Sequence, residues 1–158
     1  MVVDIVTEID IACPLPKVFQ FVADPGNAPK WYVNLKSVEW ETLPPVAEGA
    51  KIAFVATFLG RRLAYTYEVM ELIPEEKVVM RTAEGPLPMD TTYTWEAVSP
   101  DRTHMTLRNR GVPQGFSQIA APLMQRAIRR ANQKDLASLK QLLENLSCSP
   151  SHDKSNFE

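Results

Sequence analysis

The chain has little glycine, little cysteine and no long apolar run. Its 158 residues include 6 glycines and 2 cysteines, whereas an average chain of this length has roughly 11 glycines. Two cysteines without CxxC spacing are too few for a disulfide framework or a cysteine-rich zinc site. No apolar run approaches the roughly 20 residues that a membrane-spanning helix needs. We therefore expect no integral membrane segment.

Sequence motifs of the common catalytic and cofactor-binding sites are also missing. The chain contains no GxGxxG, no P-loop and no GxSxG, which excludes the usual signatures of dinucleotide binding, nucleotide hydrolysis and α/β-hydrolase chemistry. His104 and His152 are the only histidines, and neither fits a metal-ligand spacing. We expect no cofactor, no protein metal site and no catalytic triad.

Charge is nearly balanced overall but is unevenly distributed along the chain. The formal net charge is -2, so nothing indicates nucleic acid as a partner. The basic residues of the second part gather between 108 and 134, and four of them are Arg126, Arg129, Arg130 and Lys134. A solvated helix face explains them, and a surface for an anionic partner is the alternative. Acidic residues near the N-terminus replace the lysines of a signal peptide, so we expect a cytoplasmic protein.

Proline is abundant and separates the predicted elements. The chain has 13 prolines, with 45% hydrophobic and 23% charged residues, a composition typical of a globular domain. Hydrophobic alternation predicts strands and a 3.6-residue period predicts helices. Residues 2–11 form a first strand, and short helices follow at 16–24 and 28–32. Six more strands are predicted at 37–43, 51–58, 62–73, 77–83, 89–98 and 102–111.

The last predicted element is a helix of about thirty residues, from Phe116 to Leu146. Its predicted apolar face carries Ala120, Met124, Ala127, Ile128, Ala131, Leu142 and Leu146. Pro122 falls inside this pattern, so we expect either a first-turn proline or a kink. The polar tail at 147–158 is predicted to be disordered. A long amphipathic helix can cover the apolar face of an antiparallel sheet, which gives an α+β domain over residues 1–146.

This order of elements resembles the START-like (SRPBCC) superfamily of polyketide cyclase/dehydrase and lipid-transport proteins. The most specific motifs are Pro16-Lys17-Val18-Phe19-Gln20-Phe21-Val22-Ala23-Asp24 and Asn27-Ala28-Pro29-Lys30-Trp31, with Glu71-Leu72-Ile73-Pro74 and Asp135-Leu136-Ala137-Ser138-Leu139-Lys140 further on. The resemblance implies a helix-grip fold, in which a curved seven-stranded antiparallel sheet wraps around a long C-terminal helix. It also implies a hydrophobic ligand cavity between sheet and helix.

Alternation along the strands gives an inward-facing set that is apolar and aromatic with a few polar groups. The resemblance adds Trp31 at the cavity mouth, and the helix supplies the opposite wall. The predicted ligand-binding residues are Trp31, Phe54, Phe58, Tyr65, Tyr67, Met89, Thr91, Tyr93, Trp95, Met105, Leu107, Asn109, Ala120, Leu123, Met124 and Ala127. Such a lining is typical of small-molecule pockets. The alternative is that these residues are ordinary core.

Asp135 lies near the apolar face of the last helix, where a carboxylate needs a partner. A structural hydrogen bond or ion pair accounts for it, and a catalytic acid is the alternative. Three functions remain open at this stage. The first is a binder of a lipid, isoprenoid or polyketide, the second a cyclase/dehydratase that would rely on Tyr65, Tyr67, Tyr93 and Asn109, and the third an interaction module that uses the basic helix face. The sequence leaves a homodimer open.

Overall fold

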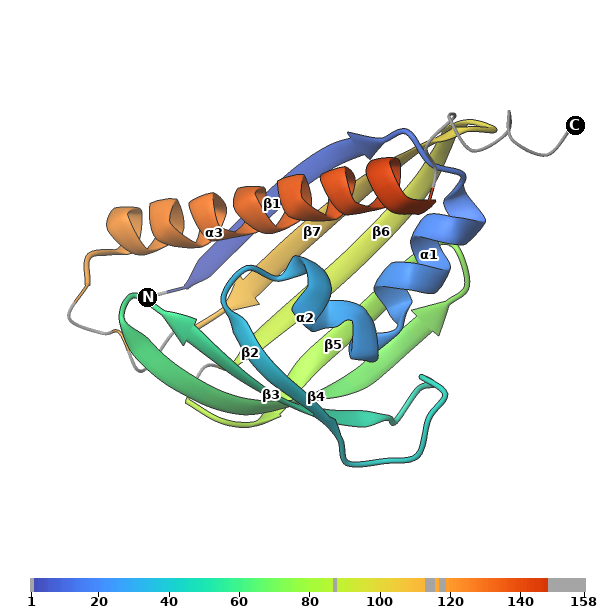
Figure 1. Ribbon diagram of the computed structural model, residues 1–158. Coiled ribbons are helices and arrows are strands. Elements are labelled where there is room, and N and C mark those ends of the chain that lie inside the picture. The colour runs from blue at the N-terminus through green and yellow to red at the C-terminus, as the bar shows by residue number, and fades with distance from the viewer. Residues whose placement is uncertain (1, 87, 113–115, 117–118, 148–158) are drawn as a thin grey trace, which may run out of the picture.

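Seven strands form one antiparallel sheet that curls around a long C-terminal helix (Figure 1). The computed structural model describes residues 2–86, 88–112, 116 and 119–147. The strands lie in the order β1-β7-β6-β5-β4-β3-β2. Their bounds are β1 Val3–Ile11, β2 Leu35–Trp40, β3 Lys51–Phe58, β4 Arg61–Ile73, β5 Lys77–Glu84, β6 Met89–Ser99 and β7 Arg102–Gly111. The predicted fold class, an α+β helix-grip fold, is confirmed.

Strand positions follow the alternation in the sequence closely. The bounds of β3 and β7 are those predicted, and most other strands differ by one residue at an end. The exception is β2, which was predicted at 37–43 and ends at Trp40. Its partner β3 begins at Lys51, and the last pair of the ladder is Trp40 with Ile52. Glu41 and Thr42 still hydrogen-bond to Lys51, the first residue of β3, but they lie outside the ladder.

The tight turn between β3 and β4 has the backbone conformation of a two-residue hairpin. Leu59 and Gly60 have φ angles of 50° and 76°, which is the left-handed region that such turns require. Glycine adopts this conformation without strain, and Leu59 accepts the strain at an exposed site. The turn fixes the register in which Phe58 pairs with Arg61. Phe54 and Phe58 thereby point to the concave face along with Tyr65.

Three short helical segments connect β1 to β2. They are α1 Leu15–Ala23, a 3₁₀ turn η1 Pro25–Asn27, and α2 Ala28–Trp31. Proline stands in the first turn of each, where its missing N–H is not needed. The Asp24 side chain accepts a hydrogen bond from Gly26 N–H, which caps η1. These segments hold Trp31 and Tyr32 against the concave side of the sheet.

The long helix begins later than predicted. It is α3 Ala121–Leu142, continued by a π-helical turn at Leu143–Ser147, whereas the predicted start was Phe116. A helix that began at Phe116 would place Pro122 in its interior, where proline has no N–H to donate to the preceding turn. Starting at Ala121 places Pro122 in the first turn, one of the two predicted outcomes. Residues 148–158 of the predicted disordered tail lie outside the described residues.

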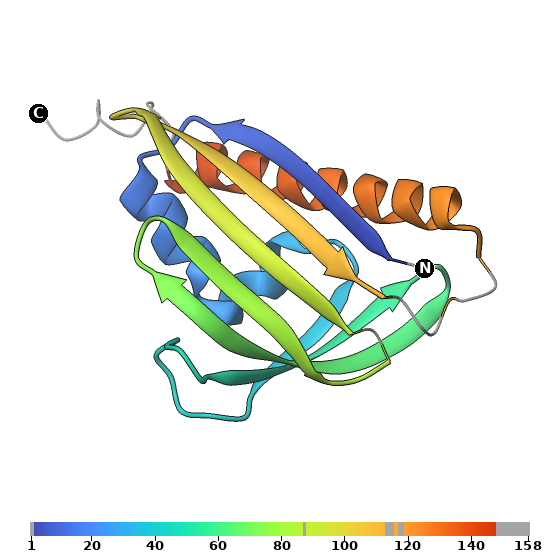
Figure 2. The same ribbon diagram turned by 180° about the vertical axis from the view of Figure 1, so that it is seen from behind.

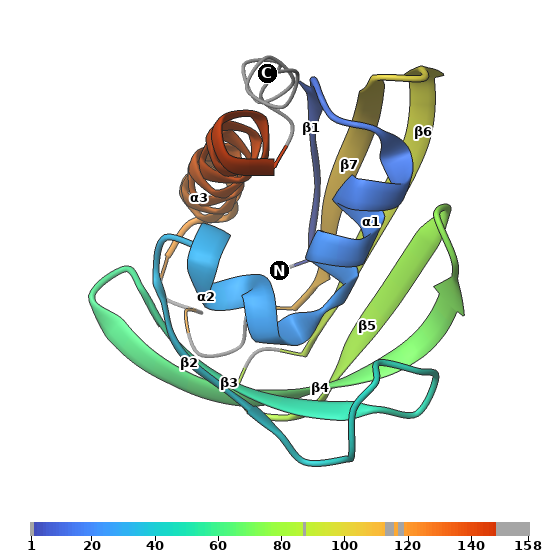
Figure 3. The same cartoon turned by 45° about the vertical axis from the view of Figure 1, so that its right-hand side comes forward.

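The buried face of α3 is rotated from the face predicted. Its buried residues are Met124, Ile128, Asn132, Asp135, Leu136 and Leu139. Ala127, Ala131 and Leu142 are only partly buried, and Ala120 precedes the helix and is exposed. The prediction was wrong because Asn132 and Asp135 are polar and were left out of the predicted apolar face. That face was therefore centred on the alanines. The helix packs mainly along β1, as the views from behind and from the side show (Figures 2 and 3).

The apolar interior forms two clusters on either side of the sheet's concave middle. The larger includes Trp31, Trp95, Leu136 and Leu139, packed around α1, α2 and the second half of α3. The smaller gathers at the first half of α3, with Val3, Ile5, Leu63, Phe116, Met124 and Ile128. No helix in the described ranges is long and apolar enough to cross a membrane.

Candidate functional site

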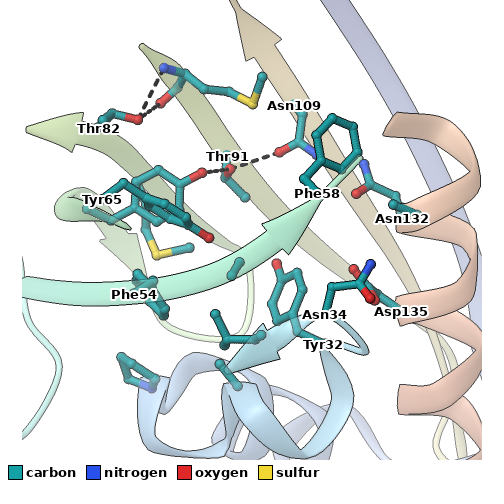
Figure 4. Close-up of a pocket in the computed structure, with 18 of the residues that line it drawn as sticks. Tyr32, Asn34, Phe54, Phe58, Tyr65, Thr82, Thr91, Asn109, Asn132 and Asp135 are labelled. Carbon is teal, nitrogen blue, oxygen red and sulfur yellow. Dashed lines mark hydrogen bonds between the residues drawn. The ribbon is translucent and has the colours of Figure 1, made fainter. Parts of the chain in front are cut away.

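A cavity of about 170 Å³ lies between the concave sheet, α2 and α3. Figure 4 shows side chains from strands and helix pointing into it from opposite sides. Its volume is close to the roughly 150 Å³ of an engineered apolar cavity that holds one benzene ring. Of the described residues that line it, Asn34 alone is exposed, and the others are buried or half-buried.

Ten of the sixteen predicted ligand-binding residues line this cavity. They are Trp31, Phe54, Phe58, Tyr65, Tyr67, Met89, Thr91, Tyr93, Asn109 and Met124. Most of them are aromatic or apolar, and ring contacts order them. Tyr65 and Tyr67 both pack against Phe54, with ring centroids 5.6 Å apart in each case. Eight of these ten residues lie on β3, β4, β6 and β7 and form the sheet wall of the cavity.

The other six predicted residues do not line the cavity. Trp95, Met105 and Leu107 point inward but lie in the larger core cluster, where the Phe19 ring packs edge-on against Trp95 at 5.3 Å. Alternation assigns a face to a strand residue, but it does not show which part of that face a helix covers. Ala120 is exposed, Ala127 is half-buried and Leu123 is 60% exposed, because α3 is rotated relative to the predicted face.

Sequence reasoning missed several residues that do line the cavity. The polar ones are Tyr32, Asn34, Thr57, Thr82 and Asn132, and the apolar ones include Leu63, Met80, Phe116 and Ile128. Asp135, which was singled out in the sequence but not as a ligand-binding residue, lines the cavity as well. Leu63 shares its strand face with Tyr65 and Tyr67, so the same alternation could have found it. Asn132 lies three residues before Asp135, the spacing of neighbours on one helix face. That spacing was the available signal for a polar pair.

On the sheet side, three side chains from different strands form a hydrogen-bonded chain. Thr91 donates to Asn109 Oδ1 at 2.8 Å, so its own oxygen accepts from the Tyr67 hydroxyl, also at 2.8 Å. Burial raises the pKa of Tyr67, which keeps its hydroxyl protonated.

A second polar group links α2 to the sheet. The hydroxyls of Tyr32 and Tyr93 are hydrogen-bonded to each other, and the Tyr32 ring stacks beside Trp31 with centroids 4.0 Å apart. Burial raises the pKa of Tyr32 and Tyr93 well above the usual range of tyrosine. These hydroxyls are therefore neutral at physiological pH. They act as hydrogen-bonding groups rather than as bases.

Asp135 is the single carboxylate among the described residues that line the cavity. It is 7% exposed, and its Oδ1 accepts a hydrogen bond from the Val33 N–H at 2.9 Å. Burial raises the pKa of this carboxyl to about 6, against the lowering effect of that hydrogen bond. This hydrogen bond is the structural role that the sequence suggested for Asp135. Asp135 secures the α2–β2 connection to α3, and it faces the cavity (Figure 4).

The other charged residues singled out in the sequence lie on the outside. His104 contacts Asp10 and Glu8 on the convex face, at 2.6 and 3.3 Å, and its neighbours there raise its pKa, Asp10 most strongly. Arg126, Arg129, Arg130 and Lys134 are exposed on α3. No cluster of three potential metal ligands occurs within the ranges that the structure covers.

Comparison with known proteins places the chain in a family. Residues 2–144 match the family model described as polyketide cyclase/dehydrase and lipid transport. The chain belongs to that family. No curated protein shows a significant match. This assignment confirms the START-like resemblance, and it covers nearly all of the described fold.

Solved structures with the same fold show little sequence similarity to this family member. The ZhuI aromatase/cyclase of Streptomyces sp. R1128 is 16% identical, with a TM-score of 0.77 over 92% of this chain and 95% of that one. A START superfamily protein of Mycobacterium smegmatis is 11% identical, with a TM-score of 0.78 over 91% and 99%. The Aha1 dimer of Colwellia psychrerythraea is 20% identical, with a TM-score of 0.64 over 90% and 96%. These likenesses establish the fold alone.

Proposed function

We propose that this protein binds a small aromatic molecule of one or two rings that carries oxygen groups, in the cavity between the sheet and α3. The observation that carries the proposal is the cavity itself, an apolar space lined by aromatic rings with a few polar groups. Such a lining is typical of small-molecule sites. Its volume of about 170 Å³ suits a ligand of one or two rings rather than a long-chain lipid.

Filling the cavity tests this function. Ala131 lines the cavity from α3, and Ala137 is exposed on the same helix, so the two alanines form a matched pair. We expect wild-type protein and Ala137→Trp to bind 2-methylnaphthalene in a calorimetric titration, and Ala131→Trp to lose at least about tenfold in affinity. Native mass spectrometry of the purified protein would show any ligand carried from the cell. Equal affinities in all three proteins, or no binding of either 2-methylnaphthalene or its hydroxyl analogue 2-naphthol, would refute the proposal.

A second function is favoured by Asp135. A cyclase or dehydratase needs a general acid or base aimed at the substrate with a pKa near the working pH, and a cavity carboxyl with a pKa of about 6 meets that requirement. In this case Asp135→Asn would lose kcat toward a poly-β-ketone substrate by at least about 100-fold while ligand binding persisted. An unchanged kcat would assign Asp135 to binding and structure only. The ligand-binding function does not depend on this outcome.

A further inference from the structure

Two polar side chains on α3 stand next to each other in the apolar cavity. Asn132 and Asp135 are three residues apart and both line the cavity, so their side chains lie on the same face of the helix. Asn132 is 6% exposed and Asp135 is 7% exposed. Figure 4 shows both extending from α3 toward the sheet. The other described residues of α3 that line the cavity, Met124, Ile128 and Ala131, are apolar.

Neither side chain has its hydrogen-bonding capacity filled by the protein. Asn132 Nδ2 is buried and has no hydrogen-bond partner within the described residues. Asp135 accepts one hydrogen bond, from Val33 N–H, although an ionised carboxylate offers about four lone-pair sites. Buried polar groups in native structures almost always have partners. An unused donor beside an underused acceptor therefore indicates a ligand group that serves both.

The groups around Asp135 determine whether the cavity can accept a charged ligand. The titratable groups that face it are tyrosines, namely Tyr32 of the α2–β2 connection, Tyr93 of β6 and Tyr65 of β4. Burial raises the pKa of each, so all are neutral. The described lining contains no lysine, arginine or histidine. A ligand carboxylate would meet the carboxylate of Asp135 with no cation to offset the repulsion.

We propose that Asn132 and Asp135 together bind a hydroxyl group of a neutral aromatic ligand, and that the cavity rejects ligands with a carboxylate. A hydroxyl is both acceptor and donor. Its oxygen accepts from Asn132 Nδ2, and its hydrogen is donated to the free oxygen of Asp135. A ketone would satisfy Asn132 alone and an ammonium group Asp135 alone. This proposal rests on the proposed binding function and names its ligand class.

Three probes of the same ring system test the proposal on the wild-type protein. They are 2-naphthol, 2-methylnaphthalene and 2-naphthoate, which place a hydroxyl, a methyl or a carboxylate at one position. In calorimetric titrations at pH 7.5 we expect 2-naphthol to bind about tenfold more tightly than 2-methylnaphthalene, as one satisfied hydrogen-bonding site predicts. We expect 2-naphthoate to bind at least about tenfold more weakly than 2-methylnaphthalene. Equal affinity of 2-naphthol and 2-methylnaphthalene, or tight binding of 2-naphthoate, overturns the hydroxyl proposal but leaves the binding function standing. No binding of any probe refutes both.

Variants then assign the effect to the two residues. Asn132→Leu should remove the advantage of 2-naphthol over 2-methylnaphthalene, whereas the exposed amide variant Gln133→Leu should keep it. Asp135→Asn should raise the affinity for 2-naphthoate, because the like charge is gone. If Asn132→Leu still bound 2-naphthol about tenfold more tightly than 2-methylnaphthalene, Asn132 and Asp135 would not be the residues that bind the hydroxyl. The wild-type series decides the matter even if a variant fails to fold.

Discussion

The two halves of α3 differ in what they contact. The second half, with the turn that continues it, is buried in the larger core, where Leu136, Leu139 and Leu143 are at most 1% exposed. It is also tied to the end of β1, since Lys140 Nζ donates to Asp10 O at 2.8 Å and Ala12 N–H donates to Glu144 Oε2 at 2.7 Å. The first half packs only Met124 and Ile128 into the smaller cluster and leaves Leu123 60% exposed.

The difference shows how one helix both stabilises the fold and borders a cavity. The anchored half is buried among the apolar side chains of the larger cluster, whereas Met124 and Ile128 of the other half both pack in the smaller cluster and line the cavity. Asn132 and Asp135 lie at the boundary between the two. Polar groups that would weaken a filled core are tolerated there because the cavity separates them from the apolar packing. Substitutions in the two halves should therefore have unequal effects.

The largest effect is expected from the anchored half. Leu139→Ala removes a side chain that is 0% exposed, and such changes in a filled core reduce the free energy of unfolding by about 2–5 kcal/mol. Met124 is equally buried but lines the cavity, so Met124→Ala enlarges an existing space and should cost about half as much. Urea unfolding of both variants measures the contrast. Equal losses would show that the halves are packed alike.

Next in size is the effect of pH through Asp135 at the boundary. Its pKa is raised from 3.8 to about 6 in the fold, so as pH falls the folded state takes up a proton at a higher pH than the unfolded state does. Stability linked to this group therefore rises as pH falls from about 6 to about 4, and above pH 6 the ionised carboxylate imposes a penalty on the order of 3 kcal/mol. Asp135→Asn lacks this dependence. Urea unfolding from pH 4 to 7 should show the variant gaining on wild type as pH rises, and parallel curves would contradict this.

A smaller effect is expected at the tie between α3 and β1. Glu144→Gln removes the charge from the hydrogen bond to Ala12 N–H and from the contact with Lys140 at 2.6 Å. We expect a loss of about 1 kcal/mol in the free energy of unfolding, because hydrogen bonds to charged groups are stronger than neutral ones. The exposed Glu41→Gln serves as control and should change stability by less than about 0.5 kcal/mol. Equal losses of unfolding free energy in Glu144→Gln and Glu41→Gln would show that the contacts of Glu144 do not stabilise the anchored half.

The sheet was predictable because its signal is local. Alternation along β3, β4, β6 and β7 is set by one buried face, so the amino-acid sequence alone places Phe54, Tyr67 and Thr91 on the concave side. Their position over a cavity came from the family resemblance and not from alternation. Trp95 shows the limit of the pattern, since it shares that face and is covered by α1.

The α3 wall of the cavity was harder to predict because two of its residues are both polar and buried. A helical wheel assumes that polar residues face solvent, and Asn132 and Asp135 face the cavity. Sites of function are where such local rules are expected to fail. Pro122 indicated that α3 either begins next to it or is kinked there, and the sequence alone did not distinguish the two.

The position of β1 at the edge of the sheet has a consequence for how the chain folds. The ladder from β2 to β7 joins strands that follow one another in sequence, so each hairpin closes a short loop. In contrast, β1 pairs with β7 across about 100 residues, as in the contact between Thr7 and Leu107. Loop closure over that length is entropically costly and slow. Since α3 packs mainly on β1, we expect the meander to form first, and the two ends of the chain to join it together in the rate-limiting step.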